Sequence, residues 1–406
     1  MPKLDELIRE LCPDGVETKK LKVFLVIKNG SDYKRFGAGD YPVYGSGGIM
    51  TYIDRYAYDK PSVLIPRKGS IEKLYYVEEP FWNVDTIFYT EIDTTKAIPK
   101  YVYYCLQKKH LKEYNTAGGV PSLTQKVLND IEIPLPPLEI QREIVRILDN
   151  FTKLTAELTV ELTTRKTQYS YYRDKLLTFD VRAKKKKIGE LTRVFSAARV
   201  HKNEWTTEGV PFYRSSDVIS KFNGVENSRG KAYISFDLYK KLSEKSGKIM
   251  KDDILITGGG SIGIPYIVPT NDPIYVKDAD LLCIQKSDKF NSRFLYHYFL
   301  STEFRKYLKN ITHNATIAHY TISQIEDTLV PLPSIEIQNR IVNVLDNFEK
   351  ICSDLNIGLP AEIEARQKQY EYYRDKLLTF AETGNTILSR AEQSRAEQSR
   401  AEQSTD

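Results

Sequence analysis

IPLPPLEIQREIVRILDNF, at residues 133–151, occurs almost unchanged a second time as VPLPSIEIQNRIVNVLDNF at residues 330–348. A second pair of matches follows, YSYYRDKLLTF at residues 169–179 and YEYYRDKLLTF at residues 370–380. Two matches of this length, far apart in one chain, indicate an internal duplication. The order of segments is therefore a variable block, a repeated segment, a second variable block and the repeated segment again.

Each repeated segment predicts a long helix, because its apolar residues recur every three or four positions. The stripe consists of Ile140, Ile144, Leu148, Phe151 and Leu158 in the first copy, and of Ile337, Ile341, Leu345, Phe348 and Leu355 in the second. A lone helix would expose such a stripe, so we expect the two copies to pair along it in a coiled-coil-like seam. The alternative is that each helix packs only on its own domain.

The second copy holds four extra residues, around Asn356–Pro360. Gly358 and Pro360 should break this helix, with a restart at Ala361. The first copy has TAELTVEL at Thr155–Leu162 without a breaker, which predicts a continuous helix.

The two variable blocks, residues 1–132 and 181–329, show short apolar runs between Gly and Pro, a pattern of mixed strand and loop. The expected strands are Leu21–Ile27, Ser62–Pro66, Thr86–Tyr89, Asp253–Thr257, Tyr266–Pro269 and Leu281–Gln285, and the expected helices are Lys100–Lys112 and Ser292–Lys309. LIPRKGSI at 64–71 aligns with LITGGGSI at 255–262, which indicates one fold with diverged surfaces. The tail repeats SRAEQ three times within 389–403, a polar composition typical of a disordered segment.

Composition limits the class of protein. The net charge is +5, with 59 Lys and Arg against 54 Asp and Glu, which permits a polyanionic partner without requiring one. The four cysteines are scattered without a CxxC pair, so neither a disulfide framework nor a zinc site is expected. Neither a signal peptide nor a membrane-spanning run is recognisable, and we expect a soluble, cytoplasmic protein.

Motifs of catalysis are missing. GGGSIG at 258–263 lacks the spacing of a phosphate-binding loop and is expected to be a tight turn. The sequence shows no nucleophile elbow, HExxH, kinase set, nuclease cluster or Asn-Pro-Pro-Tyr run of amino-methyltransferases. The sequence thus predicts a chain without catalytic residues, a bound metal or a cofactor of its own.

Polar loop residues offer candidates for DNA contact, because Arg, Lys, Asn and hydroxyl side chains bind phosphates and base edges. The candidates are Lys34, Arg35, Tyr44, Ser46, Arg67 and Lys68 in the first block, and Arg214, Ser215, Ser216, Lys221, Arg229, His313 and Asn314 in the second. The alternative for each is an ordinary solvated loop side chain.

The repeated PLP-x-x-EIQ…LDNF helix and YYRDKLLTF ending, together with YPVYGSGGIMTYIDRYAYDKPSVLIPRKG and FWNVDTIFY in the first block, resemble the specificity subunits of type I restriction–modification enzymes, the HsdS family. The resemblance spans residues 1–380. It implies that each variable block is a target recognition domain for one half of a split, asymmetric DNA site. It also implies that the repeated helices pair antiparallel, set the distance between the half-sites and dock two modification subunits.

The expected fold is therefore α+β: two mixed α/β recognition domains, separated and joined by two long antiparallel coiled-coil-like helices, in a pseudo-twofold repeat. The expected boundaries are 1–133 and 181–330 for the recognition domains, 134–180 and 331–380 for the helical spacers, and 381–406 for the tail. The expected partners are double-stranded DNA, the modification subunits and restriction (motor/nuclease) subunits. S-adenosylmethionine, ATP and Mg would belong to those partner subunits. A coiled-coil scaffold that binds only protein is the alternative function.

Overall fold

The computed structural model of the chain describes residues 2–115, 118–179, 184–225, 227–228, 230–312, 319–354 and 356–383. The chain divides into two compact units: unit 1 consists of Met1–Glu157 and Glu364–Asp406, and unit 2 of Leu158–Ile363. Unit 1 thus combines segments from both ends of the chain, whereas unit 2 is one continuous segment.

Unit 1 is built on an antiparallel sheet with strand order β2-β8-β5-β6. Its strands are β2 (Leu25–Asn29), β8 (Ile87–Ile92), β5 (Ser62–Pro66) and β6 (Tyr75–Val77). Side chains alternate between the faces of a strand: Val63 and Ile65 lie in the main core of the unit, and Leu64 lies in a second cluster with Phe81 and Ile87. This alternation buries all of β5, as expected for a central strand with both faces covered.

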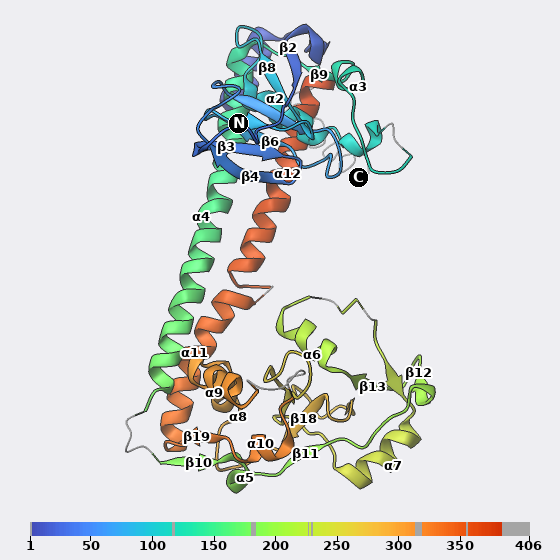
Figure 1. Cartoon of the computed structure of the whole chain (residues 1–406), viewed down its shortest axis with the longest axis vertical. Helices are drawn as coiled ribbons and strands as arrows, with labels where there is room; N and C mark the ends of the chain where they lie inside the picture. Colours follow the sequence, from blue (N-terminus) through green and yellow to red (C-terminus); the bar gives the residue numbers. More distant parts are fainter. Residues whose placement is uncertain are drawn as a thin grey trace, which may run out of the picture. The chain divides into compact units, whose positions relative to one another are not determined.

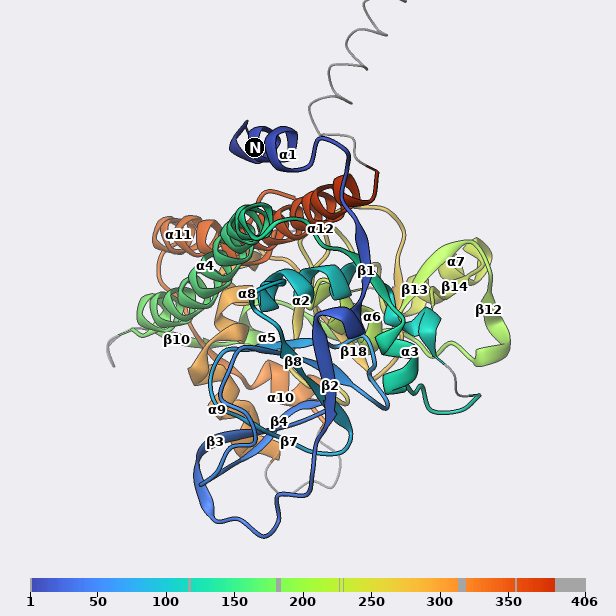
Figure 2. The same cartoon turned by 90° about the horizontal axis from the view of Figure 1, so that it is seen from above.

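Further elements of unit 1 surround this sheet. A three-stranded sheet has the order β4 (Gly48–Ile53), β3 (Ala38–Gly45) and β7 (Trp82–Asn83), and β1 (Thr18–Lys20) pairs with β9 (Glu132–Pro134). The helices are α1 (Pro2–Leu11), α2 (Pro99–Lys108) and α3 (Gln125–Asn129), with 3-10 turns at Leu21–Val23 and Leu111–Tyr114. Figure 2 shows α1 on the side of the unit where the long helices lie, away from β3, β4 and β7.

Unit 2 contains a sheet of the same antiparallel kind, with strand order β11-β18-β15-β16. Its strands are β11 (Val194–Ser196), β18 (Leu281–Ile284), β15 (Ile254–Thr257) and β16 (Pro265–Ile267). A second sheet consists of β12 (Trp205–Thr206), β14 (Tyr233–Ile234), β13 (Val210–Tyr213) and β17 (Tyr275–Val276). A third pairs β10 (Lys185–Lys187) with β19 (Leu329–Pro331). The helices are α5 (Ile188–Leu191), α6 (Ser215–Phe222), α7 (Phe236–Ser246), α8 (Ser292–Leu300), α9 (Thr302–Thr312), α10 (Ile322–Glu326) and α11 (Ile335–Ser353), with a 3-10 turn at Lys202–Glu204.

Three sequence-based element predictions need correction. The expected helix Lys100–Lys112 is the helix Pro99–Lys108, followed by a separate 3-10 turn at Leu111–Tyr114. The expected strand Leu21–Ile27 begins as the 3-10 turn Leu21–Val23, and the strand itself is Leu25–Asn29. The expected helix Ser292–Lys309 is two helices, because Ser301 has an extended backbone and its hydroxyl accepts a hydrogen bond from the Phe304 amide at 3.2 Å. A serine in that role ends one helix and caps the next.

The first repeated segment forms one helix, α4 (Leu138–Leu177), of 40 residues. The TAELTVEL run lies inside it, and the predicted continuity is confirmed. Figure 1 shows α4 beside α12 (Leu359–Thr383) in unit 1 and beside α11 in unit 2. The contacts agree: Phe151 stacks on Tyr373 with ring centroids 5.3 Å apart in unit 1, and Tyr172 stacks on Phe348 at 5.5 Å in unit 2.

The second repeated segment is broken, as its Gly and Pro predict. The Asp354 carboxylate accepts hydrogen bonds from the amides of Asn356 and Ile357, at 2.7 and 3.1 Å, and turns the chain after α11. A Cβ at Gly358 would lie 2.6 Å from the carbonyl oxygens of Lys350 and Asp354, so only glycine fits. The restart is at Leu359 rather than Ala361, because a helix accepts proline in its first turn, where Pro360 lies.

Candidate nucleic-acid interface

In unit 1, Thr86 joins two segments that carry predicted DNA-contact residues. The Arg67 amide donates to the Thr86 carbonyl at 2.8 Å, and the Ser46 amide donates to the Thr86 hydroxyl at 3.3 Å. Thr86 stands directly before β8, so the sheet holds both segments. The hairpin end at Ser46 and the turn after β5 therefore lie together, as a DNA-contact surface requires.

The turn after β5 also pairs with the loop before α3. Lys68 forms a β-bridge with Ser122, and the Leu123 amide donates to the Arg67 carbonyl at 2.9 Å. The Arg67 guanidinium lies 5.9 Å from the Phe88 ring centroid, and Lys68 is exposed. Neither cation has an ion-pair partner among the described residues, so both remain free for an external anion.

Tyr44 and the Lys34–Arg35 pair occupy different surroundings. Tyr44 is half-buried against Tyr75 and Phe81, and burial raises the pKa of its hydroxyl above the ordinary value. Lys34 and Arg35 lie exposed in the turn before β3, with the Arg35 guanidinium 4.8 Å from the Phe36 ring. They belong to another loop than the Ser46–Arg67–Lys68 group.

In unit 2, Asp280 stands directly before β18 and has the role that Thr86 has in unit 1. Its carbonyl accepts hydrogen bonds from the Gly258 amide and from the Ser215 hydroxyl, both at 2.8 Å. The turn after β15 pairs with the loop before α10 through a bridge between Gly259 and His319. The two units thus hold equivalent turns in place by equivalent bonds, while the side chains at these turns differ.

Arg214 and its neighbours are engaged within unit 2. Arg214 forms an ion pair with Asp217 at 2.8 Å and donates to the Gly230 carbonyl at 2.5 Å. Burial opposes ionisation of Asp217, but the hydrogen bonds from Arg214 keep the pKa of that carboxyl below its ordinary value. Ser216 accepts a hydrogen bond from Asn227 at 3.3 Å. These residues therefore organise the start of α6.

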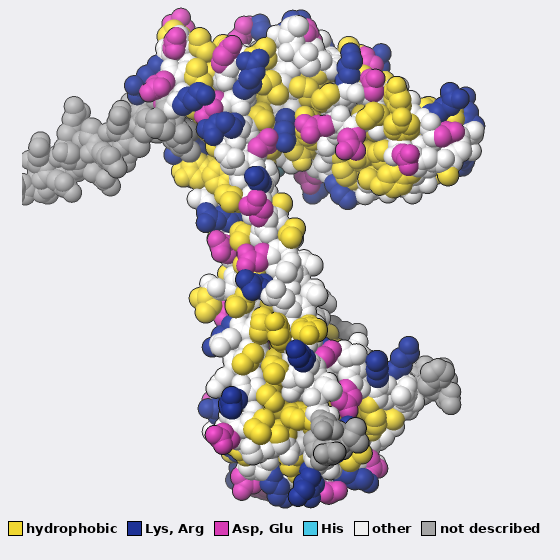
Figure 3. Space-filling model, turned by 90° about the vertical axis from the view of Figure 1, so that its left-hand side faces the viewer, with side chains coloured by type: hydrophobic (Ala, Val, Ile, Leu, Met, Phe, Trp, Pro, Cys, Tyr) yellow, Lys and Arg dark blue, Asp and Glu magenta, His cyan; other side chains and the backbone are white. Residues whose placement is uncertain are grey.

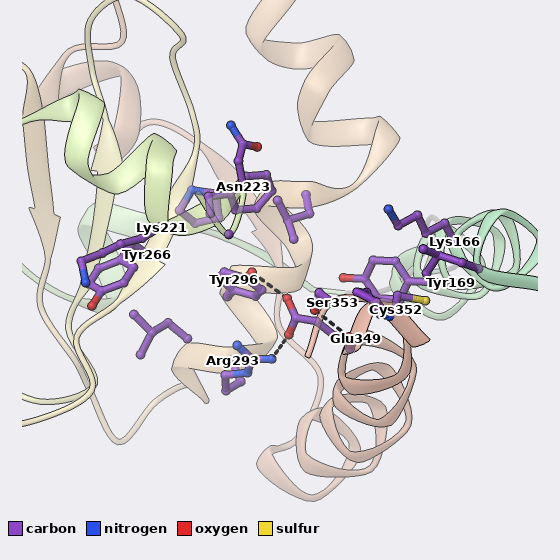
Figure 4. A pocket seen from close by; sticks show the side chains of 17 residues that line it. Lys166, Tyr169, Lys221, Asn223, Tyr266, Arg293, Tyr296, Glu349, Cys352 and Ser353 are labelled. Carbon is purple, nitrogen blue, oxygen red and sulfur yellow. Dashed lines mark hydrogen bonds and ion pairs between the residues drawn. The ribbon is translucent and has the colours of Figure 1, made fainter. Parts of the chain in front are cut away.

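Lys221, near the end of α6, lies at the rim of a cavity of about 690 Å³. Its ammonium is 5.4 Å from the Tyr213 ring and 5.8 Å from the Tyr266 ring. Figure 4 shows Lys221 and Asn223 across the cavity from Lys166 of α4. Of the remaining candidates, Arg229, His313 and Asn314 lie outside the described residues.

The predicted helix-contact residues lie in several environments. Ile140, Ile144, Leu148 and Leu345 are fully buried, and Ile341 is nearly so. Phe151 and Phe348 are partly buried in the aromatic stacks described above, and Leu158 is half-buried. Ile337 is 45% exposed. Leu355 lies outside the described residues.

Two polar pairs that sequence reasoning missed attach the long helices to the recognition blocks. Gln141 and its equivalent Gln338 are fully buried. The Gln141 side-chain carbonyl accepts from the Ile98 amide at 2.8 Å, and that of Gln338 accepts from the Asn291 amide at 2.8 Å. Ile98 and Asn291 are the N-caps of α2 and α8, so each glutamine binds the start of a recognition-block helix.

Asp149 and Asp346 form the second pair. Asp149 accepts from Tyr104 at 2.5 Å and pairs with Lys100 at 3.0 Å. Asp346 accepts from Arg293, and its carboxylate lies 2.7 Å from His297 Nε2. The signal that would have found these residues is their repetition: each is a polar residue kept in both copies of an otherwise apolar stripe.

His297, Asp346 and Glu349 are near enough to one another to hold a metal ion. Arg293 already bonds to both carboxylates, however, and Tyr296 donates to Glu349 at 2.7 Å, as Figure 4 shows in part. Arg293 thus offsets part of the negative charge, and these bonds fasten α8 to α11. No helix among the described ranges has the length and hydropathy needed to cross a bilayer.

Charge is mixed over the surface. On the face shown in Figure 3, Lys and Arg side chains alternate with acidic and hydrophobic ones and form no single basic patch. This agrees with the small net charge of +5. Binding to a polyanion would therefore rest on local groups such as Arg67 and Lys68 rather than on a general positive field.

Comparison with known proteins identifies the family. The family model described as "Type I restriction modification DNA specificity domain" matches residues 13–164 and 181–365. A Haemophilus influenzae protein named as a type I restriction enzyme specificity subunit is 31% identical over 358 residues, covering 85% of this chain and 89% of that one. The Escherichia coli EcoR124I/EcoR124II specificity subunit is 33% identical over 308 residues, covering 72% and 73%.

Solved structures agree in fold. The S subunit of a type I restriction–modification system from M. genitalium has a TM-score of 0.52 at 15% identity, covering 91% of this chain and 96% of its own. A chain from a study of type I system assembly has a TM-score of 0.56 at 14% identity, covering 90% and 98%. With two family matches that coincide with the internal repeat, this chain belongs to the DNA specificity subunits of type I restriction–modification systems, the non-catalytic subunits that provide sequence specificity.

Proposed function

We propose that the two recognition blocks each bind one half of a split, asymmetric DNA site. The observation that carries this proposal is the equivalence of the Thr86 and Asp280 positions. Each holds the turn after an equivalent strand at the same place in the sheet, but one turn presents Arg67 and Lys68 and the other presents glycines. The same framework with different side chains favours two different half-sites.

The recognition domains in this proposal are residues 1–133 and 181–330. Residues 134–180 and 331–380 would act as two antiparallel helical spacers in a pseudo-twofold repeat, the first through the continuous helix α4 and the second through α11 and α12, and 381–406 would be the tail. The two aromatic stacks support the antiparallel pairing, since α4 contacts α12 through Phe151 and α11 through Tyr172. The length of α4 would then determine the number of base pairs between the half-sites.

Two equivalent exposed patches on the spacer helices support docking of two modification subunits. Tyr171 and Tyr372 occupy equivalent positions and are 59% and 58% exposed. Each lies under an equivalent lysine, Lys175 at 5.6 Å and Lys376 at 5.4 Å. Exposed tyrosines kept in both copies favour one partner bound twice. We call these surfaces the tyrosine patches: Tyr171, Tyr172 and Phe348 in unit 2, and Tyr372, Tyr373 and Phe151 in unit 1.

In the complete enzyme the modification subunits would supply S-adenosylmethionine-dependent adenine methylation, and restriction subunits would supply ATP- and Mg-dependent movement and cleavage. The complex would act in the cytoplasm, on chromosomal and incoming duplex DNA. This chain contributes the geometry: two DNA-contact surfaces at a distance that its helices set.

Methylome sequencing tests the proposal. The chain is co-expressed with the modification subunit of its own system, and methylated adenines are mapped. We expect one bipartite motif with a constant spacer. Arg67→Ala should relax or weaken only one half of this motif, whereas Lys22→Ala, which removes a cation that pairs with Asp130, should leave both halves unchanged. An undivided motif, or loss of both halves in Arg67→Ala, contradicts the proposal.

A further inference from the structure

A cavity of about 690 Å³ lies within unit 2, between the recognition block and the helix pair α4 and α11. The helix wall carries Lys166 and Tyr169 of α4 and Cys352 of α11. The opposite wall consists of the end of α6, strand β16 and helix α8, and it includes Phe222 and Tyr266. Figure 4 shows side chains of both walls around the cavity. Small-molecule sites in proteins occupy about 300–1,000 Å³, so this cavity has room for a ligand of nucleotide size.

Two ammonium groups at this cavity are uncompensated. Glu349, the one carboxylate among the lining side chains, pairs with Arg293, which also pairs with Asp346. The charge of Arg293 is therefore already engaged. Lys166 and Lys221 have no ion-pair partner in the part of unit 2 that the structure describes. A ligand that is attracted to both lysines is an anion.

Aromatic rings lie beside these cations. Phe222, the last residue of α6, is 41% exposed, and Tyr266 on β16 is half-buried. The Lys221 ammonium is 5.8 Å from the centroid of the Tyr266 ring. Exposed aromatic faces beside lysines bind nucleotides, because a base stacks on the ring while an ammonium binds the phosphate. Asn223, which also lines the cavity, offers an amide donor and acceptor to the edge of a base.

The cations of this cavity are not part of the internal repeat. The position of Lys166 is occupied by Gln367 in the second copy of the repeated segment. Helix α6, which supplies Lys221, stands between β13 and β14, whereas β3 and β4 of unit 1 are joined by the short turn Ser46–Gly47. A partner that is bound twice through repeated features does not require cations found in one copy only. These lysines therefore favour a ligand specific to unit 2.

The cavity is also separate from the turn of unit 2 that is equivalent to Arg67–Lys68. Ser215, the first residue of α6, donates to the Asp280 carbonyl at that turn. Lys221 lies almost at the other end of the same helix. Since a helix rises about 1.5 Å per residue, roughly 9 Å separate the two positions. Helix α6 thus contacts the turn with its first residue and the cavity with its last ones.

We infer that this cavity binds a nucleoside 5′-phosphate. The base lies against Phe222 and Tyr266 on the recognition-block wall, and the phosphate reaches Lys166 on the helix wall. Lys221, beside Tyr266, adds a second positive charge at the rim. The bound nucleotide joins α6 to α4 within unit 2. This inference goes beyond the proposed function and depends neither on docking of modification subunits nor on base contacts of either block.

Isothermal titration calorimetry of the purified full chain with adenosine 5′-diphosphate and with adenosine tests this inference. Lys166→Gln gives this position the side chain that the second copy has, so folding should be retained. It should weaken binding of the diphosphate by about tenfold or more and leave binding of adenosine unchanged, because only the phosphates contact Lys166. Phe222→Ala, at an exposed position, should weaken both ligands by about tenfold, because both contain the base. Lys153→Gln, which changes an exposed lysine of α4 outside the cavity, is the matched control and should bind both ligands as the wild type does.

Chemical protection locates the bound ligand. The chain is treated with acetic anhydride, with and without adenosine 5′-diphosphate, and acetylated lysines are quantified by mass spectrometry. The diphosphate should slow acetylation of Lys166 and leave that of Lys153 unchanged.

The inference is overturned if the wild-type chain does not bind the diphosphate, if Lys166→Gln weakens binding of the diphosphate and of adenosine equally, or if both lysines are protected equally. Duplex DNA supplies a further test. If DNA displaces the diphosphate and Lys166→Gln weakens binding of DNA to the same extent, the cavity belongs to the DNA interface instead.

Discussion

Gln141 and Gln338 show how a single polar residue attaches a long helix to a recognition domain. Each amide bonds to backbone groups on both sides: Gln338 accepts from the Asn291 amide and donates to the Pro333 carbonyl at 2.9 Å. Both side chains are fully buried, and the backbone partners of Gln338, at Asn291 and Pro333, are partly buried. Removing such a residue lowers stability mainly because its backbone partners lose their hydrogen bonds.

Gln338→Ala should therefore lower the free energy of unfolding of unit 2 by about 1–2 kcal/mol, because it leaves two partly buried backbone groups without their hydrogen-bond partner. The chain has two tryptophans, Trp82 in unit 1 and Trp205 in unit 2. In a Trp82→Phe background, Trp205 fluorescence reports urea unfolding of unit 2 alone. The exposed neighbour Glu336→Ala serves as the control and should change stability by less than about 0.5 kcal/mol. Equal effects of the two substitutions would contradict this role.

Asp346 should give unit 2 a dependence on pH. Burial opposes its charge, but hydrogen bonds from His297 and Arg293 hold the pKa of this carboxyl below its ordinary value of 3.8. A lowered pKa in the folded state stabilises at pH above the ordinary value, and the benefit is lost as pH falls through the lowered pKa. Asp346→Asn should thus destabilise unit 2 by about 1–3 kcal/mol at pH 7. The difference from wild type should shrink below pH 3.8; a difference independent of pH would refute the assignment.

At the scale of elements, the first copy of the repeated segment forms the unbroken helix α4, whereas the second copy forms two helices, α11 and α12. The difference arises at Gly358, where carbonyl oxygens of Lys350 and Asp354 leave no room for a Cβ. The length of the continuous helix α4 is thus set by its own backbone hydrogen bonds. This helix is therefore the element in which to test control of the DNA spacer between the half-sites.

Inserting one further Thr-Ala-Glu-Leu unit after Leu162 should lengthen the spacer of the methylated motif by about one or two base pairs. Four residues add roughly 6 Å of helix, and duplex DNA rises about 3.4 Å per base pair. Both half-sites should stay the same. Val160→Ala, at a position 67% exposed in the same helix, should leave the spacer unchanged. An unaltered spacer after the insertion would contradict the hypothesis that the length of α4 sets the distance between the half-sites.

At the scale of the whole molecule, a DNA-specificity subunit differs from a protein-only scaffold in its response to salt. Binding of duplex DNA by the complex with modification subunits should weaken steeply as salt rises, because phosphate contacts release counterions. Lys68→Ala should reduce the slope of log K against log salt by about 0.9 if Lys68 contacts one phosphate. Lys22→Ala is the matched control. If Lys68→Ala leaves this slope unchanged, Lys68 does not belong to the DNA interface.

The sequence by itself determined the duplication, the helical nature of the repeated segments, the break near Gly358 and the family. These features depend on the local spacing of apolar residues and on helix-breaking residues, whose effects extend over a few residues. It located Ser62–Pro66 as a strand for the same reason, but missed the division of Ser292–Lys309 at Ser301, since a serine within an apolar run carries no breaker signal.

Only the tertiary structure decided which residues meet. Ser46, Arg67 and Ser122 are far apart in the chain, and their proximity depends on sheet pairing and on Thr86. The tertiary structure also showed that Arg214 forms an ion pair with Asp217. Ile140 and Ile337, equivalent residues of the two copies, differ in exposure because α1 covers the first and no described helix covers the second in the same way. Periodicity tells which face of a helix is apolar; what covers that face depends on contacts between distant segments, which no local pattern encodes.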